Sequence, residues 1–141
     1  MNKHKGFSLV EILVVLVIMG LLVSIIAPNV MGRADDARVQ KVFADFSAIQ
    51  TALRMYRLDN YNLPSSEQGL RALVERPTLA PVPANWKAGG YLPSLPVDPW
   101  GNAYLYLSPG SQGEVDIFTY GADGVRGGEG QNADLGNWQQ P

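Results

Sequence analysis

The side chains of this sequence that could do chemistry are mostly carboxylates. Cysteine is absent, and the single histidine, His4, lies within the first few residues. Without them, most of the chain has no thiol nucleophile, no disulfide, no His-based triad and none of the usual nitrogen or sulfur ligands of zinc. Paired carboxylates are then the only common catalytic groups that remain. Because so few catalytic side chains are present, we expect a protein that is not an enzyme.

One carboxylate lies where a charge is costly. Glu11 interrupts the apolar segment KGFSLVEILVVLVIMGLL, residues 5–22. As a helix, the apolar run from Phe7 to Ala27 would span about 30 Å, the thickness of a bilayer core. A charged residue at the centre of a bilayer costs roughly 2.5–3.5 kcal/mol, and less near the interface. Glu11 therefore needs a compensating partner or a tolerant position.

Three interpretations of this segment compete. A cleaved signal peptide fits poorly, because Pro28 follows the sequence Ile-Ile-Ala and makes a poor cleavage site. A plain membrane anchor explains the length but leaves Glu11 as an interfacial carboxylate with no role. A cut after Gly6 would make Phe7 a free N-terminus, whose amine could compensate a carboxylate in lipid.

The segment KGFSLVEILVVLVIMGLL resembles the leader of type IV pilins and pseudopilins. In that family an inner-membrane prepilin peptidase cuts after the glycine and methylates the new amine. The resemblance implies that residues 1–6 are a leader, that the cut falls between Gly6 and Phe7, and that Phe7 becomes N-methylated. It also implies that Glu11 engages the Phe7 amine of a neighbouring subunit as a filament grows, so that a misplaced subunit keeps an uncompensated acid. Ser8 stands where threonine is common.

The hydrophobic pattern indicates the helix that carries this motif. Pro28 and Gly32 predict a kink or local melting after the apolar run. An apolar stripe at helical spacing then predicts an amphipathic second half that packs on a small domain and ends near Asp59. We expect the helix to run from Phe7 to about Leu58. The stripe consists of Val39, Val42, Phe43, Phe46, Ile49, Leu53 and Tyr56.

The rest of the chain predicts a small α+β domain. Residues 63–77, LPSSEQGLRALVERP, indicate a short second helix capped by Ser65 or Ser66. The proline-rich residues 77–99 predict an irregular excursion that buries Leu79, Trp86 and Tyr91. The segments AYLYLS and VDIFTY predict an antiparallel pair of strands, and we expect a third strand without assigning its position.

The C-terminal segment YGADGVRGGEGQNADLGNW combines glycines with three carboxylates, those of Asp123, Glu129 and Asp134. Glycines permit tight turns with positive φ, which can point carbonyl groups inward. Calcium takes six to eight oxygen ligands in a flexible cage. The spacing does not match an EF-hand. The residues alone leave two interpretations open, a calcium site and a flexible acidic loop.

The segments VDPWGNAYLYLSPG and GADGVRGGEGQNADLGNW resemble the C-terminal half of the major pseudopilins of bacterial type II secretion systems. In those proteins a calcium ion clamps the loop that a disulfide closes in adhesive type IV pilins. The resemblance implies calcium ligands from Asp123, from Asp134 and from the carbonyl groups of Tyr120 and Val125, with Glu129 as the remaining acid. The alternative is that Asp123 caps a turn through its own backbone.

The resemblance implies a type IV pilin-like fold, in which a long N-terminal helix packs its amphipathic half on a small domain with a short helix and an antiparallel sheet. Residues 7–27 would be a single transmembrane or filament-core helix of the inner membrane, and 28–141 a periplasmic domain. Lys3 and Lys5 favour an N-terminus in the cytoplasm, which likewise places the rest of the chain on the periplasmic side.

The implied function is that of a structural subunit. Copies would polymerise into a periplasmic filament that helps move folded proteins through an outer-membrane secretin. Implied partners are further copies, minor pseudopilins, the prepilin peptidase, an inner-membrane platform protein and a cytoplasmic ATPase. Nucleic acid is not expected, since 11 basic residues balance 13 acidic ones. The alternatives are a subunit of a type IV pilus or DNA-uptake pseudopilus, and a membrane-anchored binding domain that works as a monomer.

Overall fold

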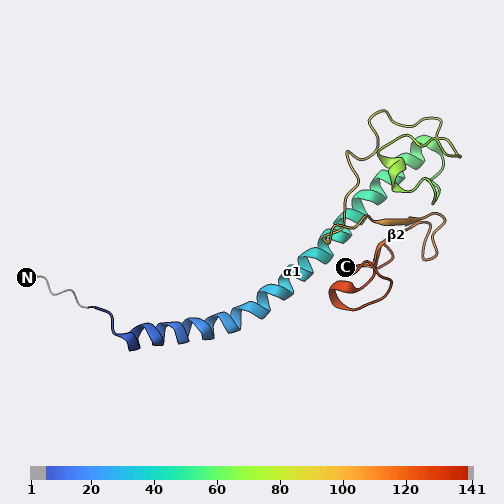
Figure 1. Ribbon diagram of the computed structural model, residues 1–141. Coiled ribbons are helices and arrows are strands. Elements are labelled where there is room, and N and C mark those ends of the chain that lie inside the picture. Colours follow the sequence, from blue (N-terminus) through green and yellow to red (C-terminus); the bar gives the residue numbers. More distant parts are fainter. Residues whose placement is uncertain (1–5, 140–141) are drawn as a thin grey trace, which may run out of the picture. The chain divides into compact units, whose positions relative to one another are not determined.

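The computed structural model of the chain describes residues 6–139, with the backbone alone for residues 27–31 (Figure 1). The predicted leader residues 1–5 lie outside the described residues. Two structural units divide the chain, one up to Ala37 and one from Arg38 onward. The elements are α1 (Leu9–Asn60), the 3₁₀ helix η1 (Leu70–Leu73), β1 (Leu105–Leu107), β2 (Asp116–Thr119), the 3₁₀ helix η2 (Gly130–Asn132) and β3 (Leu135–Gly136).

The first unit consists mainly of the N-terminal part of α1. Its residues Leu9–Ile26 have a mean hydropathy of 3.1, and none of them is buried. Length and composition therefore allow this part of the helix to cross a membrane. Its exposed apolar side chains form a far larger surface than a soluble protein leaves in water, so lipid or other apolar helices must cover them.

The helical backbone of α1 continues through Pro28 and Gly32, so the predicted local melting does not occur. A proline removes one internal hydrogen bond, and the bonds on either side are sufficient to keep the helix. The helix ends at Asn60, close to the predicted end. Tyr61 adopts a positive φ of 63°, and its N–H donates to the carbonyl of Arg57 at 2.7 Å, which closes the last turn.

The amphipathic stripe of α1 forms one side of the core of the second unit, as predicted. Val42, Phe46, Ile49, Leu53 and Tyr56 are buried, whereas Val39 and Phe43 are half-buried. Burying each large side chain stabilises the fold by roughly 1.5–3 kcal/mol. The sheet lies beside this half of α1 (Figure 1). Residues of η1, of the excursion and of the sheet with its flanking segment complete the core: Leu70, Ala72, Leu73, Tyr91, Tyr104, Tyr106 and Ile117.

The sheet has three antiparallel strands in the order β1-β2-β3. The predicted hairpin of β1 and β2 is confirmed, and Tyr106 pairs with Ile117. The third strand, which had no predicted position, is Leu135–Gly136, where Leu135 pairs with Thr119. A two-residue strand that contains glycine shows no alternating pattern, so the sequence does not indicate it.

Two predictions for the segment after α1 need correction. The second helix is shorter than expected, because it is only the four-residue η1. Ser65 and Gln68 do form reciprocal hydrogen bonds of 3.0 and 3.2 Å between side chain and backbone N–H, but Gly69 takes a φ of 60° and delays the helical turn. Leu79 is 53% exposed rather than buried. Its carbonyl accepts from Gln68 Nε2 at 2.7 Å, so hydrogen bonding through its backbone anchors this segment.

Candidate functional site

The N-terminal motif lies at the start of α1. Gly6 and Phe7 precede the helix, the Phe7 side chain is 80% exposed, and nothing lies within 4 Å of the position that a Cβ of Gly6 would take. The Gly6–Phe7 peptide bond is therefore outside the helix and open to another molecule. This accessibility is what cleavage by a peptidase requires.

Glu11 lies in the first turn of α1 and is exposed. Its N–H donates to the carbonyl of Ser8 at 3.0 Å. The positive end of the helix dipole favours a carboxylate here, by about 0.3–1 kcal/mol at an exposed site. No ion pair reaches Glu11 among the side chains that the structure describes. The carboxylate thus stands in an apolar, exposed stretch and is available to a cation from another molecule.

The second candidate site is the acidic loop, residues 120–134, which joins β2 to β3. Its base is closed by the pairing of Thr119 with Leu135 and by a 2.9 Å hydrogen bond from Ala122 N–H to the carbonyl of Gln131. Gly121 has a φ of 71°, and a Cβ there would approach the Gln131 carbonyl oxygen to 2.7 Å. Only glycine permits both this backbone conformation and this close approach.

The two aspartates of the acidic loop bind backbone amides of the loop itself. Asp123 Oδ1 accepts from Val125 N–H at 3.1 Å, which is the turn-capping geometry of the alternative interpretation. Both carboxylate oxygens of Asp134 accept from Gly127 N–H at 3.0 Å. Asp134 therefore draws the middle of the loop back to its base.

The other predicted ligands occupy the same loop without converging. Glu129 and Val125 are exposed, and the Tyr120 ring packs on Phe118 at 5.5 Å between ring centroids. Within residues 6–139, no three carboxylate, histidine or cysteine side chains gather closely enough to hold a metal ion. The oxygen-only donors suit calcium in kind, but a cation here would need backbone carbonyls beside Asp123 and Asp134. The predicted ligand set stays a prediction.

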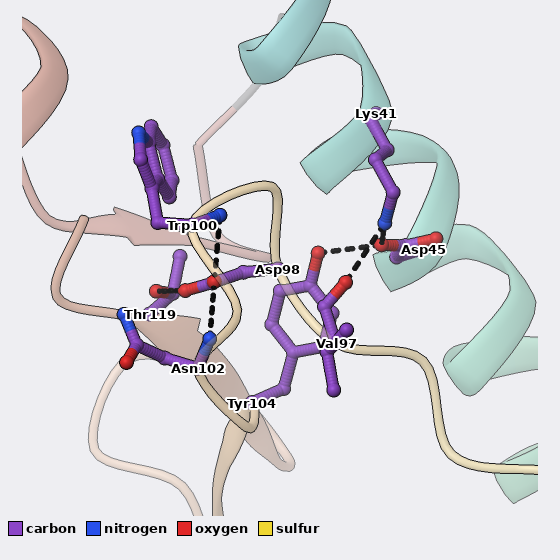
Figure 2. A network of polar contacts seen from close by, with 8 residues as sticks. All are labelled: Lys41, Asp45, Val97, Asp98, Trp100, Asn102, Tyr104 and Thr119. Carbon is purple, nitrogen blue, oxygen red and sulfur yellow. Dashed lines mark hydrogen bonds and ion pairs between the residues drawn. The ribbon is translucent and has the colours of Figure 1, made fainter. Parts of the chain in front are cut away.

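A buried aspartate next to the acidic loop was not among the predicted site residues. Asp98 is 2% exposed and lies in the turn 97–103 that precedes β1. Its Oδ1 accepts from the N–H groups of Trp100 at 3.1 Å and Asn102 at 2.7 Å, and its Oδ2 accepts from the Thr119 hydroxyl at 2.5 Å (Figure 2). The DPWGN sequence indicates the turn, but the contact with Thr119 depends on the tertiary structure.

The same turn is fastened to α1. Lys41 donates to the Val97 carbonyl at 2.8 Å and to Asp45 at 2.6 Å, and the Tyr104 hydroxyl also donates to Asp45 at 2.6 Å (Figure 2). Burial raises the pKa of Tyr104 well above its ordinary value, and the hydrogen bond to Asp45 raises it further. Tyr104 therefore stays a neutral hydrogen-bond donor.

A second buried aspartate holds the turn between β1 and β2. Asp116 is 1% exposed. Its carboxylate accepts from the N–H and hydroxyl of Ser111, each at 2.7 Å, and from the N–H groups of Gln112 and Gly113, each at 3.1 Å. Burial alone would raise the pKa of Asp116, but these hydrogen bonds outweigh burial and lower it below its ordinary value of 3.8.

A Gly-Phe-x-x-x-Glu motif lies at the start of an apolar helix that is long enough to cross a membrane. An α+β unit follows, with a glycine-rich loop before its last strand. This is the architecture of a type IV pilin-like subunit. The family model of the prokaryotic N-terminal methylation motif matches residues 1–27. The model of type II secretion system protein G matches residues 29–138.

Known proteins agree with these two matches. The type II secretion system core protein G of Vibrio cholerae is 53% identical over 138 residues, which cover 98% of this chain and 94% of that protein. The protein of the same name from Pseudomonas aeruginosa is 52% identical over 137 residues, covering 97% and 96%. The crystal structure of the major pseudopilin of enterohaemorrhagic Escherichia coli has a TM-score of 0.71 and 50% identity, over 79% of this chain and 95% of that one.

The chain belongs to the type II secretion system protein G family, the major pseudopilins. It is a structural subunit of secretion machinery and not an enzyme.

Proposed function

We propose that copies of this chain are the repeating subunits of a periplasmic filament, the pseudopilus, that grows from the inner membrane and helps move folded proteins through an outer-membrane secretin. The observation that carries the proposal is the exposed apolar surface of Leu9–Ile26, in which no residue is buried, with Glu11 in its first turn. In the membrane, lipid covers this surface. In the filament, the apolar helices of neighbouring copies replace the lipid.

Assembly would begin with cleavage by the prepilin peptidase between Gly6 and Phe7. Residues 7–27 would then be the single membrane-spanning or filament-core helix, and 28–141 the periplasmic domain. The new amine of Phe7 would compensate Glu11 of a neighbouring copy, so that the charge selects the correct stacking of subunits. Minor pseudopilins, the platform protein and the cytoplasmic ATPase would act on the assembling filament.

The mass of the chain purified from its native membrane tests this processing. We expect a polypeptide that begins at Phe7 and carries one additional methyl group. The open Gly6–Phe7 bond and the methylation motif support this expectation. A chain that still begins at Met1 would leave Glu11 without its partner amine. The apolar part of α1 would then be an ordinary membrane anchor.

We propose that the acidic loop binds calcium, with Asp123 and Asp134 as side-chain ligands and the carbonyls of Tyr120 and Val125 beside them. Glu129 would lie at the periphery and add negative charge. Calcium would hold the loop in one closed conformation. The proposal is supported by the oxygen donors that Asp123 and Asp134 place on one loop. The base of this loop is closed by the hydrogen bond from Ala122 N–H to the Gln131 carbonyl.

Removal of calcium is expected to lower the melting temperature. If only the folded chain binds the ion, a free concentration tenfold above Kd stabilises the fold by about 1.4 kcal/mol. For a domain of this size that corresponds to a shift in Tm of about 5–10 °C. The measurement is thermal unfolding of the full chain in detergent, followed by tryptophan fluorescence with calcium and with excess chelator. Asp123→Ala is the control, and its Tm should be the same with calcium and with excess chelator. Identical curves for the unmodified chain would contradict the calcium site.

A further inference from the structure

We infer that Asp98 and Thr119 are positioning residues for the acidic loop: through their buried hydrogen bonds they hold the Gly121 peptide groups in place, and thereby position the carboxylate of Asp123 for the proposed calcium ion. This inference rests on the proposed calcium role of the loop.

The contacts tie both backbone groups of Gly121 to the turn 97–103. The Gly121 N–H donates to the Thr119 hydroxyl oxygen at 3.3 Å, and its carbonyl accepts from Asn102 Nδ2 at 3.4 Å. The Thr119 hydroxyl in turn donates to Asp98, which also accepts from the backbone N–H of Asn102. Asp98 therefore orients the two residues that hold Gly121.

The return arm of the loop confines Gly121 from the other side. A Cβ at this position would approach the backbone of Gln131, Asn132 and Ala133 to between 2.7 and 2.9 Å. Asp123 follows two residues later, so a rotation of the Gly121 peptide groups would move its carboxylate directly. Free movement at the base of the loop is thus limited by the return arm on one side and by Thr119 and Asn102 on the other.

The turn itself is fixed to the core, which makes it a suitable support. Lys41 holds the carbonyl of Val97, the residue before Asp98, and Tyr104 is held by Asp45. The first contact joins the turn to α1, and the second joins the residue directly after the turn to α1, whose stripe is buried in the core. The orientation of Gly121 therefore follows from the packed part of the second unit. Residues that orient metal ligands in this way typically change metal affinity by about 10–100-fold when they are replaced.

The chain offers a matched control for the destabilisation that any such replacement causes. Asp98 and Asp116 are both buried aspartates that accept backbone N–H groups, and Asp116 lies at the other end of β2, away from the acidic loop. Asp98→Asn leaves a single acceptor oxygen, which cannot serve both the Thr119 hydroxyl and the N–H groups of Trp100 and Asn102, so one side of the contact is lost. Asp116→Asn disturbs the turn at residues 111–113 instead.

The test is a calcium titration by calorimetry of the full chain in detergent, together with amide hydrogen exchange of the calcium-free chain. We expect Asp98→Asn and Thr119→Val to raise the calcium Kd about tenfold or more and to speed exchange at Gly121. Thr119→Ser keeps the hydroxyl, and Asp116→Asn shares no partner with the loop, so both should keep Kd within about twofold.

Wild-type Kd values in both Asp98→Asn and Thr119→Val would overturn the inference. An equal loss of affinity in Asp116→Asn would also overturn it, because a general loss of stability would then be the cause. If the unmodified chain binds no calcium, the proposed calcium role fails. In that case unchanged exchange at Gly121 in the two variants overturns the positioning of the loop as well, whereas faster exchange shows that the calcium proposal alone is wrong.

Discussion

Glu11→Leu is expected to abolish filament assembly while the chain still inserts into the membrane. Leucine removes the cost of a charge in lipid, so insertion should be unchanged or improved. Assembly should fail because the Phe7 amine of a neighbouring copy loses its counter-charge in an apolar filament core. Removing one partner of a buried ion pair costs about 3–5 kcal/mol. Since 1.4 kcal/mol is a factor of ten, subunit addition should weaken by about a hundredfold or more.

The measurement compares filament yield by electron microscopy with the amount of subunit in the membrane. Ser24→Ala is the matched control within the same helix, because the Ser24 hydroxyl donates to the carbonyl of Leu21 at 2.7 Å in its own turn. The control should assemble normally. Filaments of Glu11→Leu in wild-type quantity would show that Glu11 is an interfacial carboxylate, and the first helix would then be the anchor of a monomeric periplasmic domain.

Asp116→Ala is expected to lower the free energy of unfolding of the second unit by about 3 kcal/mol. The substitution leaves the N–H groups of Ser111, Gln112 and Gly113 without their acceptor. Hydrogen bonds to a charged group each contribute about 1.5–3 kcal/mol, but this turn is exposed and water replaces part of the loss. Chemical denaturation of the full chain in detergent measures the difference. Glu67→Gln, at an exposed carboxylate, is the control and should be close to the unmodified chain.

The lowered pKa of Asp116 also predicts how this contribution depends on pH. Because the pKa is lower in the folded chain than in the unfolded chain, the ionised carboxylate stabilises the fold above the ordinary value of 3.8. This stabilisation decreases as the pH falls below that value and through the folded pKa. The stability difference between the unmodified chain and Asp116→Asn should be constant near neutral pH and shrink in acid. A difference that stays constant down to strong acid would contradict this role of Asp116.

The elements that were predictable from the sequence depend on long or local patterns. The apolar run from Phe7 to Ala27 predicts the first half of α1, and the stripe from Val39 to Tyr56 predicts the half that is buried in the core. Both predictions succeed because an apolar pattern that keeps the helical period over many turns fits a helix and hardly any other structure. The Gly6-Phe7 motif with Glu11 is equally local, and it indicated the broad class of pilins and pseudopilins. The C-terminal segments indicated the type II secretion family.

The positions of the buried aspartates were decided by the tertiary structure. Asp98 reaches Thr119 across 21 positions of sequence, and Tyr104 reaches Asp45 across 59. Such partners follow from how the turn, the sheet and α1 pack together, which a local pattern does not specify. The same holds for β3, a two-residue strand that is defined only by its pairing with β2.

The sequence by itself determined the helix, its apolar and amphipathic halves, the hairpin of β1 and β2, and the residue types of the acidic loop. The tertiary structure decided which of those residues meet. It placed Asp123 on the Val125 amide and Asp134 on the Gly127 amide, and it made Gly121 the point where the turn 97–103 supports the loop. The physical reason is range: periodicity and turn chemistry act between neighbours in the sequence, whereas burial and hydrogen bonds to buried carboxylates join residues that only the folded chain brings together.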